Sequence, residues 1–153
     1  MDQTFSVFAR ISKPVSEVFE AVADPDTLSH YFTTGSAKGR LETGATVTWD
    51  FHDFPGAFPV EVVRVDPDKH IHLRWDANDQ GAKGDAAYRI DVTMDFEDLG
   101  DGRTLVTISE AGWRDTPSGV KGSYGNCMGW SQMLCALKMW VEHGINLREG
   151  MYK

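Results

Sequence analysis

The side chains in this sequence whose types and spacing could do chemistry are, first of all, aromatic. The chain has five tryptophans, eight phenylalanines and four tyrosines among 153 residues. Trp49 and Trp75 stand at apolar positions of alternating segments, and Trp130 stands on the apolar stripe of a helical segment. Rings that converge from separate elements can line a pocket for a small molecule, although core packing is the more common explanation for any single ring.

The histidines raise the question of a metal site. His70 and His72 alternate in one segment, and His52 lies upstream. No cysteine or paired carboxylate completes a zinc-binding spacing around them. His72 also shares its parity with Arg74, on a polar face of the segment. The sequence therefore predicts no metal ligand.

Acid–base or nucleophilic catalysis has little support in the sequence. Asp91, Asp95 and Glu97 lie on the polar face of an alternating segment, which favours a solvent face with salt bridges. No G-x-S-x-G motif or phosphate-binding glycine loop is present. At inward strand positions, Tyr88 is the main polar exception. The sequence predicts no catalytic residue and no cofactor, and it favours a protein without enzymatic activity.

The periodicity of apolar residues indicates the elements that must position these side chains. A strand is expected over Phe5–Ile11, then a helix starting near Pro14 and a second short helix from Pro25. The residues 35–44, 54–59, 78–85 and 113–122 are expected to form loops or turns. Further strands are expected over about 47–51, 58–65, 71–75, 88–96 and 103–111. The final helix is expected over Tyr124–Leu147.

This order of elements predicts an α+β fold. Short neighbouring strands joined by tight turns favour an antiparallel sheet. The expected architecture is a curved six-stranded sheet around a long C-terminal helix, with two short helices after the first strand. The length of 153 residues suits a single domain over residues 1–153. A sheet covered by one apolar helix favours a hollow between the two layers.

Composition narrows the range of partners. The net charge is -8, and no run of basic residues exists, so nucleic acid and membrane insertion are not expected. Cys127 and Cys135 are about 12 Å apart on a helix, too far for a disulfide, and are expected to be small buried apolar residues. With no leader segment in the sequence, a cytoplasmic location is expected.

Four segments together give the chain a family resemblance: Ile11–Leu28, Val60–Trp75, Thr104–Trp113 and Gly129–Gly144. The sequence resembles the START-like (SRPBCC) helix-grip superfamily of the birch-pollen allergen and polyketide cyclases. Within it, the chain is most similar to homologues of the activator of the heat-shock protein 90 ATPase. The resemblance implies a cavity between sheet and helix. It also implies a chaperone as a conceivable partner, and it implies no catalytic motif.

The predicted function is the binding of a small hydrophobic or aromatic ligand between sheet and helix. The alternatives are a co-chaperone-like interaction protein and a polyketide-cyclase-like enzyme. Excess apolar surface at Met139 and Trp140 is expected either to form a homodimer or to pack against the C-terminal tail, Ile145–Lys153. The predicted ligand-binding residues are Trp49, Phe51, Trp75, Tyr88, Ile90, Val92, Trp130, Met133, Leu134 and Leu137.

Overall fold

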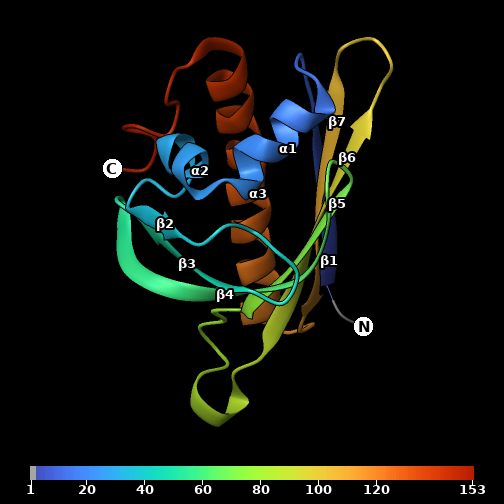
Figure 1. The fold of residues 1–153 in the computed structure, drawn as a ribbon. Helices are drawn as coiled ribbons and strands as arrows, with labels where there is room; N and C mark the ends of the chain where they lie inside the picture. Colours follow the sequence, from blue (N-terminus) through green and yellow to red (C-terminus); the bar gives the residue numbers. More distant parts are fainter. Residues whose placement is uncertain (1–2) are drawn as a thin grey trace.

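A computed structural model describes residues 3–153 as a seven-stranded sheet wrapped around a long helix (Figure 1). Every neighbouring pair of strands is antiparallel, in the order β1-β7-β6-β5-β4-β3-β2. The elements are β1 Gln3–Ile11, α1 Val15–Ala23, α2 Pro25–Tyr31, β2 Ser36–Lys38, β3 Thr46–Phe51, β4 Phe54–Asp66, β5 His70–Asp76, the 3-10 turn η1 Gly84–Ala86, β6 Arg89–Asp98, β7 Thr104–Trp113 and α3 Pro117–His143.

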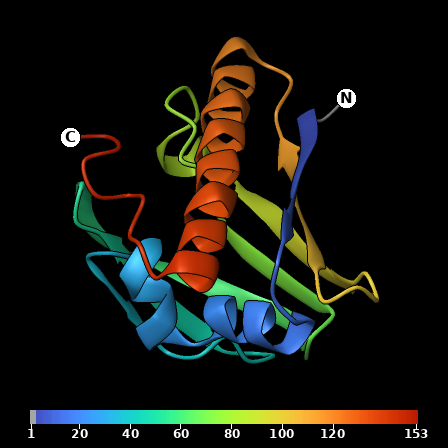
Figure 2. The same cartoon turned by 90° about the horizontal axis from the view of Figure 1, so that it is seen from above.

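The predicted α+β helix-grip architecture is confirmed. The sheet curves around α3. The two short helices, α1 and α2, lie across one end of the space between the sheet and α3 (Figure 2). The first strand returns to the sheet beside the last one, with Ile11 opposite Thr104. The inward face of the sheet and the apolar face of α3 share one core, which includes Leu73, Val92 and Leu137, each 0% exposed.

The main differences from the predicted strands are an additional strand and a displaced turn. The structure has seven strands rather than six, because three residues of the expected loop pair as β2, with Ala37 opposite Trp49. A three-residue strand is too short to show an alternation of apolar and polar residues that would predict it from sequence. The expected turn over 54–59 instead begins β4, and the turn lies at His52 and Asp53. Proline is tolerated here because 54–59 pair only with β3; pairing with β5 begins at Glu61.

The final helix spans Pro117–His143, whereas Tyr124–Leu147 was expected, so both of its ends lie earlier in the chain. Thr116 caps its start by accepting a hydrogen bond from the Gly119 amide, and Pro117 occupies the first turn. Gly144 ends it in the left-handed conformation, at φ 67°. The start was missed because the glycines of its first turns favour a loop.

The apolar stripe of α3 is largely as predicted. Trp130, Met133, Leu134 and Leu137 are buried. The cysteines correct the prediction, because Cys127 is only half-buried and Cys135 is exposed. Across residues 3–153, the helices are all too short or too polar to cross a bilayer.

Candidate functional site

Aromatic rings from four elements meet between the sheet and α3. Trp75 of β5 stacks on Trp130 of α3, with ring centroids 5.5 Å apart and planes 12° apart. Trp49 of β3 meets the edge of Trp75 at 5.7 Å. We call this group the aromatic cluster, and its members are Phe32, Trp49, Phe51, Phe58, Trp75 and Trp130. The three predicted indoles therefore converge, and their binding of a ligand stays a prediction.

The aliphatic residues of the predicted site pack beside and beneath these rings. Val92 of β6 and Leu137 of α3 are fully buried within the main core. Ile90 is buried in a smaller adjoining cluster with Trp113 and Ala77. Met133 and Leu134 complete the helix side and are at most 2% exposed. These side chains fix the positions of the rings, whereas Phe51, Phe58 and Trp75 keep part of their surface exposed.

Tyr88 lies away from the aromatic cluster. Its ring meets Trp113 edge-on at 6.4 Å, and the Arg114 guanidinium lies 4.2 Å from its centroid. The hydroxyl donates to Asp79 at 2.7 Å and accepts from the Arg114 amide at 3.2 Å. Burial raises the pKa of this hydroxyl. The Tyr88 hydroxyl is therefore held by the loops that follow β5 and β7, and its contact with a ligand stays a prediction.

The polar group that does face the core is Glu110 of β7, which sequence reasoning missed. Its residue is 1% exposed. Oε1 accepts from the Trp113 indole at 2.7 Å, and Oε2 accepts from the Trp130 indole at 2.5 Å. The Asn126 amide donates to both oxygens, at 3.1 and 3.0 Å. Both carboxylate oxygens are thus held by neutral N–H donors from β7 and α3.

Two opposing effects act on the charge of Glu110. Burial raises the pKa of the carboxyl group, because a low-dielectric surrounding disfavours the anion. Hydrogen bonds from Trp113, Trp130 and Asn126 act in the other direction, and burial prevails. Among the described residues, no cation pairs with this carboxylate. A buried acid with a raised pKa is the kind of group that binding and catalytic sites use.

Local sequence explains how the donors of Glu110 are placed. Trp113 follows Gly112, whose φ of 100° suits glycine, and its ring packs against α3. A side chain at Gly122 would approach the Trp113 ring to 2.5 Å, so glycine lets the ring lie on the helix backbone. Val106, Ile108 and Glu110 are two residues apart on one strand, so their side chains point to the same face of the sheet. This alternation could have predicted that Glu110 faces the core.

The opposite side of the aromatic cluster carries a buried ion pair. Arg148, beyond the end of α3, donates to Asp53 at 2.8 Å, and both residues are under 10% exposed. The guanidinium lies 4.6 Å from the Phe51 ring centroid and 5.8 Å from that of Phe32. The C-terminal tail therefore closes this side of the cluster.

One polar atom inside the cluster has no partner. The indole N–H of Trp49 is buried, and within residues 3–153 nothing accepts its hydrogen bond. Leaving such a donor unsatisfied costs about 1–3 kcal/mol. An acceptor on a bound molecule would satisfy it.

The outer face of the sheet has the predicted salt bridges. His70 pairs with Asp95 at 2.7 Å, and Asp91 pairs with both His72 and Arg74, at 2.7 and 3.0 Å. In the described part of the chain, no group of three or more His, Cys, Asp and Glu side chains is placed to hold a metal ion.

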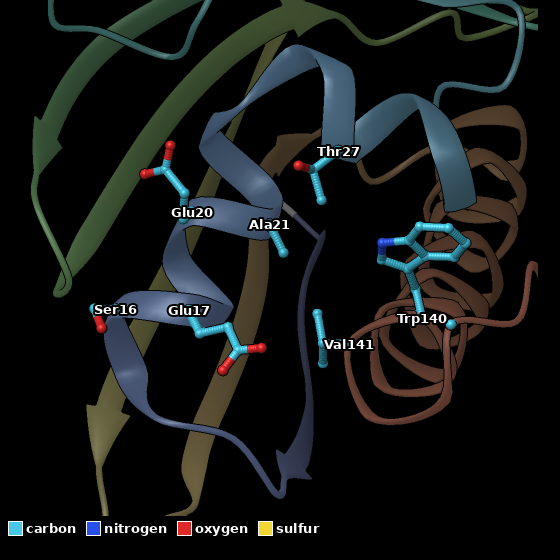
Figure 3. A pocket seen from close by; sticks show the side chains of 8 residues that line it. Ser16, Glu17, Glu20, Ala21, Thr27, Trp140 and Val141 are labelled. Carbon is cyan, nitrogen blue, oxygen red and sulfur yellow. The ribbon is translucent and has the colours of Figure 1, made fainter.

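Two surface hollows of about 540 and 260 Å³ lie away from the aromatic cluster. The larger lies between α1, α2 and the end of α3 (Figure 3). The smaller is lined by Phe19, Leu41 and Val65, among others. Neither contains a ring of the cluster, whose members contact one another across the space between sheet and helix.

Comparison with known proteins places this fold in a class. A curved antiparallel sheet around a long C-terminal helix is the helix-grip fold of START-like proteins. The chain belongs to the family described as Activator of Hsp90 ATPase homolog 1-like protein, whose family model matches residues 12–142. None of the curated proteins compared matches the chain.

Solved structures agree with this assignment. Protein SSP2350 from Staphylococcus saprophyticus is 25% identical, with 95% of this chain and 96% of that chain covered and a TM-score of 0.75. DynU16, from the dynemicin biosynthetic locus, is 26% identical, with 94% and 49% covered and a TM-score of 0.76. The Aha1 dimer from Colwellia psychrerythraea is 17% identical, with 93% and 98% covered and a TM-score of 0.71, and shows the fold alone.

Proposed function

We propose that this chain binds a small apolar or aromatic molecule between the sheet and α3, against the rings of the aromatic cluster. The observation that carries the proposal is the convergence of five rings from β3, β4, β5 and α3, together with Phe32 just after α2, around the buried indole N–H of Trp49. This N–H has no acceptor among the described residues. The partly exposed edges of Phe51, Phe58 and Trp75 give a ligand a place to enter. A carbonyl or ether oxygen on the ligand would accept from Trp49.

Glu110 gives the proposed site a titratable group, which the sequence-based prediction had lacked. Its raised pKa favours a role in proton transfer. Both of its oxygens, however, already accept hydrogen bonds from three side chains. We therefore propose binding without turnover, with Glu110 holding the Trp130 indole in place.

The test uses N-phenyl-1-naphthylamine, a neutral apolar fluorescent probe. Titration is expected to quench tryptophan emission, raise probe emission and saturate. Trp130→Ala and Trp75→Ala should each weaken the probe's affinity, because each removes one ring of the stacked pair. Phe8→Ala is the matched control, since Phe8 is an apolar ring 64% exposed on β1. An unchanged emission, or an equal effect of Phe8→Ala, would remove the proposal.

A second candidate is contact with a chaperone, and it rests on the family description, which names an activator of the Hsp90 ATPase. The direct test adds the chain to Hsp90 and measures the rate of ATP hydrolysis. A rate that does not change at saturating chain would exclude this candidate and leave ligand binding untouched.

Self-association and a cytoplasmic setting complete the proposal. A homodimer is supported by two exposed apolar side chains of α3, Tyr124 and Met128. Met139 and Trp140, from which the sequence predicted self-association, are half-buried. Sedimentation velocity at several concentrations, with Met128→Glu as the variant, tests it. A cytoplasmic location is supported by two cysteines that form no disulfide.

A further inference from the structure

The larger surface hollow lies on the outside of the fold, between α1, α2 and the carboxyl end of α3 (Figure 3). We call it the α1–α3 groove. Its volume of about 540 Å³ falls within the range of small-molecule sites. Its lining residues are Ser16, Glu17, Glu20, Ala21, Thr27, Trp140, Val141 and Gly144.

Trp140 gives the groove an aromatic wall and a free donor. One face of its indole is covered by the His30 ring, with centroids 4.7 Å apart and planes 6° apart. Figure 3 shows the indole turned towards Thr27, with its nitrogen on the groove side. Among the hydrogen bonds of residues 3–153, none involves this nitrogen. Ala21 and Val141 add apolar surface next to the ring.

The groove also carries one uncompensated negative charge. Glu20 is neutralised by Arg40, which donates to both of its oxygens, at 2.5 and 2.8 Å. Glu142, close to the groove on α3, is paired with Lys138 at 2.6 Å. Glu17 makes no ion pair within the described residues, and Figure 3 shows its carboxylate directed towards Val141.

The end of α3 adds to this negative potential. The helix is 27 residues long and ends at Gly144, whose amide donates to the Trp140 carbonyl at 2.8 Å. The last carbonyls of a helix lack helical partners and carry partial negative charge, which favours a cation nearby. A carboxylate and a helix carboxyl end each attract a cation, and here both line the groove beside the apolar surface of Ala21, Trp140 and Val141.

We propose that the α1–α3 groove binds a small organic cation, namely a primary ammonium on a short aromatic or aliphatic body. The ammonium lies beside Glu17, and the body packs on Trp140 and Val141. This site shares no residue with the aromatic cluster, so it stands or fails independently of the function proposed above.

The experiment titrates 2-phenylethylammonium into the full chain and follows the ¹H–¹⁵N spectrum. The Trp140 indole peak, assigned with Trp140→Phe, is expected to shift in a saturable manner together with amides of α1. Glu17→Gln should weaken binding by roughly 2- to 5-fold, the scale of an exposed charge pair. The uncharged analogue 2-phenylethanol should lose a similar factor on the unaltered chain.

Glu97→Gln is the matched control, because Glu97 is an exposed carboxylate on β6 without an ion pair in the described residues. It should leave the affinity unchanged. An unaltered affinity in Glu17→Gln, equal binding of 2-phenylethanol, or shifts centred on the Trp75 and Trp130 indoles would each overturn the proposal. Since Glu17 is exposed, a preserved spectrum of the variant verifies that its fold is intact.

Discussion

Two buried carboxylates lie on opposite sides of the aromatic cluster, and they are held in different ways. Glu110 is 1% exposed and is held by three neutral side chains that donate N–H groups. Asp53 is 4% exposed and is held by one cation, Arg148. The first arrangement joins a strand of the sheet to the middle of α3. The second joins a two-residue turn to the C-terminal tail.

The two arrangements differ in how completely they satisfy their polar atoms. Both oxygens of Glu110 accept hydrogen bonds, whereas Oδ2 of Asp53 and Nε of Arg148 have no partner among the described residues. Neutral donors spread around a carboxylate thus give a partner to each of its oxygens, which the single guanidinium does not do here. An opposite charge is therefore not required to bury an acidic side chain in this fold, although burial raises the pKa of Glu110.

The largest effect is expected at the ion pair. Arg148→Met removes the partner of Asp53 and leaves a buried charge, which should lower the free energy of unfolding by about 3–5 kcal/mol. Urea denaturation measures the loss. Asp53→Leu in the same background should recover much of it. Arg64→Met is the control, because Arg64 and Asp66 form an exposed pair worth about 0–1 kcal/mol. A loss no greater than the control's would show that the tail does not depend on this pair.

A smaller, pH-dependent effect is expected at Glu110. Its pKa is raised in the folded chain, so the protonated form favours folding. This contribution is fully present below the ordinary pKa of glutamate, about 4.3, and is lost as pH rises through the raised pKa. Glu110→Gln has no such titration.

Comparing the two proteins tests this sign. The unfolding free energy of the unaltered chain minus that of Glu110→Gln should fall as pH rises from the ordinary pKa of glutamate through the raised pKa of Glu110. The glutamine side chain keeps one acceptor oxygen, but its NH2 group faces an indole N–H, so one hydrogen bond is lost. This loss should lower the stability of Glu110→Gln by about 0.5–1.5 kcal/mol. A difference that rises with pH would mean that the indole and amide donors outweigh burial.

The smallest effect is expected from Asn126→Ala. The carboxylate of Glu110 loses a donor to each oxygen, so its pKa should rise further, and the chain should lose about 0.5–1.5 kcal/mol of stability. Carbon-13 NMR of the Glu110 carboxyl group measures the pKa. A lowered pKa would show that water supplies better donors than the amide does.

Much of this arrangement could be predicted from sequence. Alternation located β6, and its inward residues Ile90 and Val92 are buried as that parity requires. Helical spacing located Trp130 and Leu137 on the inward face of α3. These signals are local, because each depends on residues within one element.

The rest depended on contacts between elements distant in sequence. Inward parity could have flagged Glu110, but its donor Trp130 lies 20 residues away, and no pattern links the two. Asp53 and Arg148 are 95 residues apart, in a turn and a tail without periodicity. The short strand β2 exists only because β3 offers it an edge. The polar groups of the site could therefore not be predicted from the sequence, whereas the apolar residues around them could.

The pairing of the first strand with the last has a consequence for synthesis of the chain. Ile11 pairs with Thr104, 93 residues later. At a translation rate of about 5–20 residues per second, β1 waits roughly 5–20 s on the ribosome for its partner. During that time its inward side chains, Phe5, Val7 and Ala9, have no strand β7 beside them. The first strand therefore cannot take its place in the sheet until most of the chain has been synthesised.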